Sequence, residues 1–337
     1  MSGRAAEAPP GGGPGPVSGA RLAGSVPAGR RGFTFVDYLT EGYIALVAAL
    51  VLVLHRDRIP AWPVLIGAHA AAIAFIQVLV RLFNARPRNR VLAFLRYLYP
   101  MLMYGPFYWE TGKLNHLLVA GFLDPSFLRL DARLFGVQPG LAFMDRLPYL
   151  ALSEVFYAAY FSYYLMIAGL ALALYLRSRR EFFHYVSVTS LVFYVCYLAY
   201  ILMPVVGPFI LFRELPGFPL PASLQPATVP TFPASVQAGI FFRLMEWVYV
   251  PFEAPGASFP SSHVAVAIVT VYFSFRYLRP IRWAHFVVMV LLCASTVYCR
   301  YHYVVDVAGG ALAAAILVPI GNRVYLRFGR PADLAPG

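Results

Sequence analysis

Residues 299–306 read Cys299-Arg300-Tyr301-His302-Tyr303-Val304-Val305-Asp306 and connect two long apolar segments near the C-terminus. Charged side chains at the edge of a membrane span are costly and usually serve a function. A second polar stretch begins the apolar segment just upstream, and it reads Ser258-Phe259-Pro260-Ser261-Ser262-His263. We therefore expect the fold and its functional site to be organised around these two stretches.

The composition is that of a membrane protein. Of the 337 residues, 60% are hydrophobic and 12% are charged, whereas a soluble domain has about 25% charged residues. The mean hydropathy is +0.66. The net charge of +12 does not indicate nucleic-acid binding, because the basic residues lie in clusters between apolar segments. The cysteines have neither metal-ligand nor disulfide spacing, so we expect Cys196, Cys293 and Cys299 to pack as small apolar residues.

Eight apolar segments approach the roughly 20 residues that a membrane helix needs. The weakest is the third, which Arg96 and Pro100 interrupt. The predicted fold is an all-α, polytopic transmembrane helical bundle with six to eight spans, of which eight is the preferred number. The eight segments are 36–55, 62–83, 91–109, 151–176, 182–203, 262–278, 281–299 and 303–326.

The arginines predict the orientation of this bundle. If the spans alternate in direction, five Arg-rich segments lie on one side, which the positive-inside rule makes cytoplasmic. Both termini are then cytoplasmic, and the two polar stretches share the outer face. The five segments are the N-terminal tail and the regions around 86–90, 177–180, 276–282 and 323–330.

The chain divides into five parts by composition. The first part is a basic Pro/Gly-rich tail that we expect to be disordered, without the apolar run of a secretory signal. Helices at the membrane interface are expected in the third part, on the outer face. The parts are the tail 1–32, N-terminal transmembrane helices 33–110, the outer-face interfacial segment 111–150, a catalytic core 151–327 that includes an outer loop 204–261, and a short tail 328–337.

Ser261, Ser262 and His263 are expected to start a helix. Pro260 disfavours a helical conformation in the residue before it, and serine is a favoured N-cap. The free N–H groups of a helix N-terminus attract phosphate. The alternative is a capped helix with a histidine at the level of the lipid headgroups.

Arg300, His302 and Asp306 have the residue types of a phosphoryl-transfer site. His302 and Asp306 are four residues apart, so a helix would place them on one face. The carboxylate would then fix one imidazole nitrogen and leave the other to act as nucleophile or base. Arg300 is able to clamp a phosphate with two hydrogen bonds. The alternative is an interfacial salt bridge at the end of a span.

The two stretches resemble signature motifs of the type-2 phosphatidic acid phosphatase superfamily. The compact His302-Tyr303-Val304-Val305-Asp306 version is similar to the branch that contains inositol phosphorylceramide synthase and the sphingomyelin synthases. Weaker similarities occur at Leu130–Gly136, at Glu154 with the Tyr-rich segment that follows, and at Pro204–Pro208. The resemblance covers about residues 125–320.

This resemblance implies a role for each residue of the site. His302 would attack phosphorus and form a phosphohistidine, and Asp306 would orient it. His263 would protonate the departing oxygen and then act as base for the acceptor. Arg300, Ser261 and Ser262 would hold the phosphate oxygens. No cofactor and no metal are implied.

Two departures from the family pattern favour the transferase branch. The Lys…Arg-Pro first motif of the phosphatases is not evident on the outer side, since Arg86-Pro87 falls on the predicted cytoplasmic face. The Ser–Arg spacing of their third motif is also missing, because Cys299 precedes Arg300.

Other polar residues are candidate components of the site. Glu154 is expected to support His263 from behind or to contact an acceptor hydroxyl, and the alternative is an interfacial anchor. His263, His302 and Asp306 together are also a possible zinc set. His116 is a weaker binding candidate, while His69, His184 and His285 are expected to pack.

The sequence thus predicts an integral-membrane lipid phosphotransferase. Its expected partners are a lipid phosphoester, a lipid or alcohol acceptor and the membrane. The alternatives are a lipid phosphate phosphatase, a metal-dependent membrane hydrolase, and a transporter or non-catalytic membrane scaffold. The expected location is a bacterial inner membrane with a periplasmic site, or the ER or Golgi membrane with a lumenal site in a eukaryote.

Overall fold

The computed structural model describes residues 32–55, 58–212, 231–249 and 254–329. These residues form helices, and an isolated parallel β-bridge joins Val205 and Ala257. The predicted tail 1–32 therefore lies outside the described residues, except for Gly32. Most of 328–337 and part of the loop 204–261 also lie outside them. The helices, in chain order, are α1 (Phe35–Leu54), α2 (Trp62–Ala85), α3 (Arg90–Leu102), α4 (Tyr104–Leu114), α5 (Asp124–Phe135), α6 (Pro139–Arg146), α7 (Leu150–Arg177), α8 (Arg179–Leu202), α9 (Pro208–Leu211), α10 (Ala234–Gln237), α11 (Ile240–Tyr249), α12 (Ser262–Tyr277), the 3₁₀ turn η4 (Arg279–Ile281), α13 (Arg282–Tyr298) and α14 (Val304–Phe328).

Six helical segments of the described chain are long and apolar enough to cross a membrane. They are α1, α2, α7, α8, α14 and the segment Arg279–Tyr298 that includes α13. The all-α helical bundle is therefore confirmed, at the lower end of the predicted range of spans. The predicted span 262–278 is a helix of 16 residues, which is shorter than a typical membrane span.

The predicted span 91–109, the weakest of the eight, is not a single helix of membrane length. The chain instead forms α3 and α4, which meet at Met103. Proline lacks a backbone N–H, and its ring clashes with the carbonyl four residues earlier. Pro106 therefore leaves the Leu102 carbonyl without its helical donor, and the helix is interrupted at that point.

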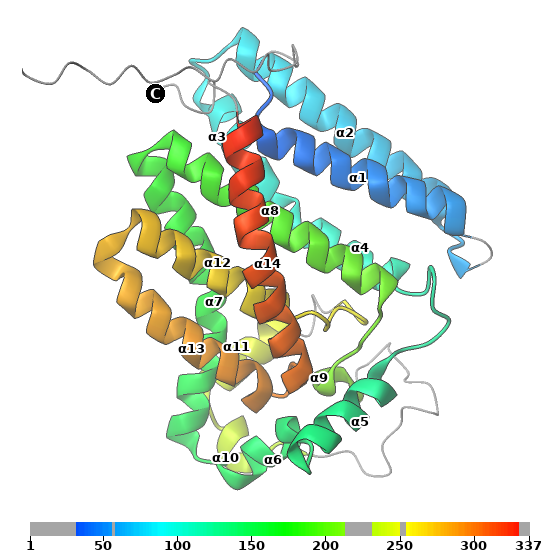
Figure 1. The fold of residues 1–337 in the computed structure, drawn as a ribbon, viewed down its shortest axis with the longest axis vertical. Coiled ribbons are helices and arrows are strands. Elements are labelled where there is room, and N and C mark those ends of the chain that lie inside the picture. Colours follow the sequence, from blue (N-terminus) through cyan, green and yellow to red (C-terminus); the bar gives the residue numbers. More distant parts are fainter. Residues whose placement is uncertain (1–31, 56–57, 213–230, 250–253, 330–337) are drawn as a thin grey trace, which may run out of the picture. The chain divides into compact units, whose positions relative to one another are not determined.

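Helix α8 lies at the centre of the packing and is the most buried of the six segments. It contacts α1, α3 and α4 from the N-terminal part of the chain, and α7, α12 and α14 from the C-terminal part (Figure 1). The short helix α12 contacts α7, α8, α13 and α14. This central place explains why α12 can be short: it is surrounded by other helices rather than by lipid.

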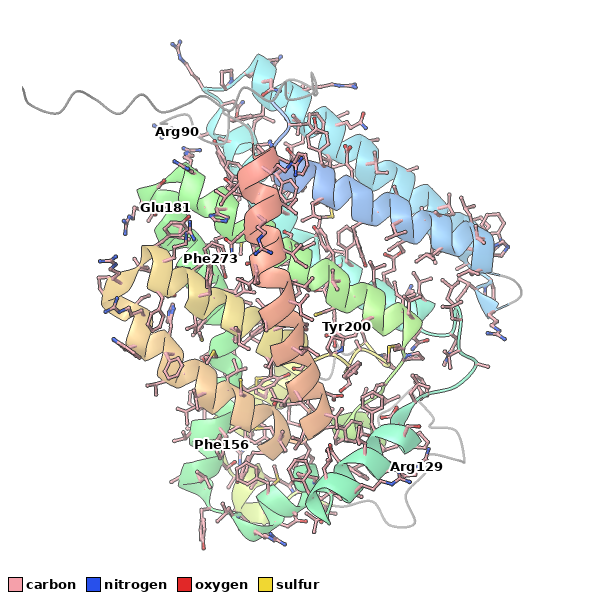
Figure 2. All side chains as sticks on the ribbon, in the orientation of Figure 1. Arg90, Arg129, Phe156, Glu181, Tyr200 and Phe273 are labelled. Carbon is pink, nitrogen blue, oxygen red and sulfur yellow. The ribbon has the colours of Figure 1, made fainter. Side chains whose placement is uncertain are left out.

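The outward faces of the long helices are apolar. Leu, Val and Phe side chains are exposed along α1, α2, α7, α13 and α14, as a surface in contact with lipid tails requires. Charged residues lie near helix ends, and Figure 2 labels two of them, Arg90 at the start of α3 and Glu181 in the first turn of α8. The protein therefore has the surface of an integral membrane protein.

Candidate active site

Three loop segments that are far apart in the sequence meet beside the first turn of α14. They are 204–207, 256–263 and 299–306. The Ser258 N–H donates to the Val205 carbonyl (2.9 Å), and the Ser261 N–H donates to the Asp306 carbonyl (3.0 Å). These backbone contacts bring the two polar stretches of the sequence together.

Two glycines permit this close approach. A Cβ at Gly310 would lie 2.4 Å from the Ser261 carbonyl oxygen, so α14 can contact the start of α12 only where it carries no side chain. Gly207 has a φ of 87°, and a Cβ there would lie 2.8 Å from Ser258 Oγ. Any larger residue at either position would push Ser258 and Ser261 away from α14.

Two buried carboxylates of α5 hold these segments in place. Asp124 accepts hydrogen bonds from the Val206 N–H, the Gly207 N–H and the Tyr303 hydroxyl, at 2.8 to 2.9 Å. Burial raises the pKa of Asp124, while these hydrogen bonds act in the opposite direction. Asp131 accepts from the first two N–H groups of α14, at 3.0 and 3.2 Å. A carboxylate at a helix N-terminus is favourable because it meets free N–H groups and the positive end of the helix dipole.

His302 lies in a polar clamp. Its Nδ1 is 3.3 Å from Asp306 Oδ2 and 3.1 Å from Ser258 Oγ, and the Ser258 hydroxyl donates to the same Asp306 oxygen at 2.6 Å. The carboxylate favours a proton on Nδ1, which leaves the Nε2 lone pair free. Nε2 is buried and has no hydrogen-bond partner among the described residues. An imidazole in this state is suited to nucleophilic attack.

The predicted contact between His302 and Asp306 is present, but its geometry differs from the expectation. Helix α14 begins at Val304, so His302 lies just before the helix rather than on it. Asp306 also accepts from the Tyr303 N–H at 3.0 Å. The carboxylate therefore folds back over the start of the helix and reaches His302 there.

His263 is the second histidine of the site. Its ring centroid is 5.7 Å from that of His302, with a T-shaped arrangement. His263 Nε2 lies 3.0 Å from the Tyr160 hydroxyl, and the Tyr160 ring stacks on Tyr301 at 4.3 Å. Tyr163 lies on α7, the helix that also carries Tyr160, and its ring contacts the ring of His263 on α12. The tyrosines of α7 thus position His263 beside His302.

Arg300 has a φ of 64° and is buried. One guanidinium nitrogen is 2.8 Å from Asp145 Oδ1, and another donates to the Thr231 carbonyl at 3.3 Å. The guanidinium also lies 4.8 Å from the Phe232 ring centroid. Burial lowers the pKa of Arg300, and the nearby Asp145 carboxylate acts in the opposite direction. These contacts anchor the 299–303 loop, so phosphate binding by Arg300 stays a prediction.

Two of the amides at the start of α12, those of Ser262 and Val264, already have partners in this structure. The Ser262 N–H donates to the Tyr200 hydroxyl (3.1 Å), and the Val264 N–H donates to Ser261 Oγ (3.4 Å). Ser261 is the N-cap, as predicted. Tyr200, labelled in Figure 2 near the end of α8, also donates to the Pro260 carbonyl (3.0 Å). Phosphate binding by these serines would require Tyr200 or the cap to exchange its contacts.

Glu154 binds the N-terminus of α11. Its carboxylate accepts from the Phe241 N–H at 3.0 and 3.3 Å. Its contact is therefore with the backbone of α11, which neither hypothesis for this residue predicted. A role for Glu154 toward an acceptor hydroxyl stays a prediction.

The other histidines have partners of their own. His184 stacks on Tyr325 at 4.3 Å, and His285 Nδ1 lies 2.6 Å from Ser274 Oγ, as expected of packing residues. His69 Nε2 lies 2.9 Å from Glu110 Oε1, an ion-pair distance that its sequence context did not predict. His116 Nδ1 faces the Val119 carbonyl.

An apolar cavity opens beside the histidine pair. It has a volume of about 820 Å³ and reaches Ser262 and His263. Its walls come from α3, α4, α7, α8 and α11. The remaining lining residues are Met101, Tyr104, Gly105, Pro106, Tyr108, Trp109, Tyr163, Tyr164, Ile167, Ala168, Phe193, Tyr197 and Val248.

The zinc alternative finds no ligand set in the described part of the chain. No group of three or more His, Cys, Asp or Glu side chains there is arranged to hold a metal ion. Within the predicted set, Asp306 points at His302 Nδ1 rather than at a point shared with His263.

Sequence reasoning missed Ser258, Tyr160, Asp124 and Asp131 as parts of this arrangement. The signals were present but incomplete. Asp131 lies in the Leu130–Gly136 similarity, Tyr160 in the Tyr-rich segment, and the loop that Asp124 binds is Pro204–Pro208. Ser258 begins the second polar stretch, yet nothing local links a serine to residues 44 and 48 positions further on.

A carboxylate-held histidine beside a second histidine, in a bundle of membrane-length helices, is typical of a membrane enzyme of phosphoryl transfer. A family model described as the PAP2 superfamily matches residues 125–320. This match covers more than half of the chain, and the protein belongs to the PAP2 superfamily. It is an integral-membrane enzyme with lipid phosphatase or phosphotransferase activity. Neither the curated proteins nor the solved structures give a significant match.

We expect Ser258→Ala to lower kcat about 10- to 100-fold with little change in KM. The hydroxyl bonds to a charged carboxylate, and such a bond contributes about 1.5 to 3 kcal/mol, of which each 1.36 kcal/mol corresponds to a tenfold change in rate. Steady-state kinetics on a soluble phosphate ester measure the effect. Ser187→Ala is the matched control, because Ser187 is buried in α8 and its Oγ has no hydrogen-bond partner among the described residues. Equal kinetics for the two variants would contradict the role of Ser258.

Proposed function

We propose that this protein transfers a phosphoryl group or a phosphorylated headgroup between lipid alcohols through a phosphohistidine, as the inositol phosphorylceramide synthase branch does. The environment of His302 carries the proposal. Asp306 and Ser258 hold its Nδ1, whereas its Nε2 is buried and has no hydrogen-bond partner among the described residues.

In the first step, the lone pair of His302 Nε2 attacks phosphorus. A P–N bond forms and the P–O bond to the lipid alcohol breaks. His263 donates a proton to the departing oxygen, and Asp306 stabilises the positive charge that develops on His302.

In the second step, the hydroxyl oxygen of an acceptor attacks the phosphohistidine. His263, now neutral, takes the proton of that hydroxyl. A new P–O bond forms, the P–N bond breaks, and His302 returns to its starting state. Arg300, Ser261 and Ser262 are proposed to bind the phosphate oxygens, as the family resemblance implies.

The apolar cavity at His263 favours transfer over hydrolysis. The hydrocarbon chain of an alcohol binds favourably to an apolar wall, which places its hydroxyl beside the general base. A water molecule makes no such favourable contact with the wall. The alternative within the same family is a lipid phosphate phosphatase, in which water is the acceptor. We further propose cytoplasmic termini and a site on the periplasmic face of a bacterial inner membrane, or on the lumenal face in a eukaryote.

The test is turnover of labelled lipid phosphoesters by the purified full-length protein, with and without ceramide or diacylglycerol. We expect labelled product on the acceptor alcohol, rising with acceptor concentration at the expense of free phosphate. Release of free phosphate alone at every acceptor concentration would establish the phosphatase instead. Absence of turnover and of a labelled enzyme across the panel would leave the transporter or scaffold alternative.

A further inference from the structure

The cavity beside His263 is partly built from elements outside the family match. Helices α3 and α4 supply residues 101–109 of its wall, and they precede the matched region 125–320. Further lining residues come from α7 and α8, within that region. The shape of this cavity is therefore set by this chain's own N-terminal helices together with the shared core.

The lining offers an apolar surface. None of the described lining residues is an acid, a lysine or an arginine. The Tyr104 hydroxyl is hydrogen-bonded to Ser190 Oγ at 2.8 Å, and the Tyr197 hydroxyl donates to the Tyr104 carbonyl at 3.2 Å. These hydroxyls already have protein partners, so the rings present carbon atoms to the cavity.

The size and position of the cavity fit a lipid chain. Its volume of about 820 Å³ is within the roughly 300 to 1,000 Å³ of small-molecule sites. Trp109, one of the lining residues, is 56% exposed, and Lys113 Nζ lies 3.6 Å from the Trp109 ring centroid. Trp and Lys anchor helices at the membrane interface, so we expect an occupant to enter from the membrane.

The chemistry of His263 determines which part of the substrate lies here. His302 attacks from one side of phosphorus, and the alcohol leaves from the opposite side, where His263 meets its oxygen. The acceptor alcohol then enters from that same side, because His263 also takes its proton. His263 lines the cavity, whereas His302 does not.

We propose that this cavity is a lipid-alcohol site, which binds the hydrocarbon chain of the departing alcohol and then that of the acceptor. The inference rests on the proposed function. It assigns α3 and α4 to the selection of chain length and shape. A diacylglycerol and a long-chain prenol share the required chemistry, namely a hydroxyl at the end of an apolar body.

Gly105→Leu is the variant that tests the site. Gly105 lines the cavity, and a Cβ there meets no atom within 4 Å, so a leucine is accommodated without displacing a neighbouring residue. We expect kcat/KM for long-chain phosphoesters to fall about tenfold or more, and kcat/KM for a water-soluble short-chain ester to stay within about twofold. Diacylglycerol phosphate and prenyl phosphate, assayed separately, show which alcohol the cavity prefers.

Gly169→Leu is the matched control. Gly169 lies on α7, its Cβ would also meet no atom within 4 Å, and it does not line the cavity. We expect this control to keep wild-type kinetics on both substrates. Ala168→Leu adds bulk to the part of the lining that α7 supplies, and it replaces Gly105→Leu if that variant does not fold.

A binding readout separates this inference from the proposed function. A photoactivatable long-chain alcohol should label residues 101–109 and 163–168 of the wild-type protein, and Gly105→Leu should reduce the labelling. Labelling without any turnover would support the site and reject the proposed function. The site would be overturned if Gly105→Leu and Ala168→Leu lowered turnover equally for short and long substrates, or did not lower it at all. The proposed function would be unaffected by that result.

Discussion

Replacing His302 with alanine is expected to lower turnover by roughly 10⁴-fold or more, the scale seen when a catalytic nucleophile is removed. The variant should also fail to form a labelled enzyme from any phosphoester. The reason is geometric: His302 is buried, its Nδ1 is held by Asp306 and Ser258, and its Nε2 is left without a partner among the described residues. No other described nitrogen is placed in this way beside His263.

The measurement combines steady-state kinetics with acid-labile, alkali-stable labelling of the protein, which identifies a phosphohistidine. His285→Ala is the matched control, since His285 lies near the start of α13 and pairs with Ser274, at the opposite end of that helix from residue 299. We expect the control to keep activity and labelling. A labelled enzyme in His302→Ala would show that another residue is the nucleophile.

Replacing His263 with glutamine is expected to lower turnover of lipid phosphoesters by about 10²- to 10⁴-fold, the usual contribution of general acid–base catalysis. A lipid alkoxide is a poor leaving group and needs the proton that His263 supplies. A nitrophenolate leaves without one. With nitrophenyl phosphate, His263→Gln should therefore still form the phosphoenzyme but release it slowly.

The decisive observation is this accumulation of phosphoenzyme. It is monitored after the enzyme is rapidly mixed with nitrophenyl phosphate. In the wild-type protein the label should turn over, because His263 activates the acceptor hydroxyl. In His263→Gln the nitrophenolate burst should be retained and the subsequent steady rate lost. A variant that loses the burst as well would show that His263 acts in positioning His302 rather than as an acid and base.

The sequence identified the parts of this site that are local along the chain. His302 and Asp306 are close because they are near neighbours along the chain, although the contact is made across the start of α14 and not on one helix face. The cap at Ser261 follows from the residues beside Pro260. The apolar segments predicted the helices because the composition of a segment of about 20 residues decides whether it can cross a membrane. The exception was 91–109, where Pro106 interrupts an apolar run after α3.

The tertiary structure alone determined the contacts between distant segments. Ser258 reaches His302, Asp131 caps α14, and Tyr160 meets His263, across separations of 44, 173 and 103 residues. Glu154 accepts a hydrogen bond from the start of α11, 87 residues further along the chain. The chain contains several residues that could serve as the hydrogen-bond partner of each of these polar groups. The packing of the helices decides which of those residues comes close enough.

By itself, then, the sequence determined that this is a helical membrane protein with a histidine–aspartate pair next to a second histidine motif. Composition and short spacings carry that information because they act within one helix or one turn. The tertiary structure decided how His302 is held and that α3 and α4 form a wall of the cavity at His263. These features depend on close approach at Gly207 and Gly310 and on helix packing, which are properties of the whole fold.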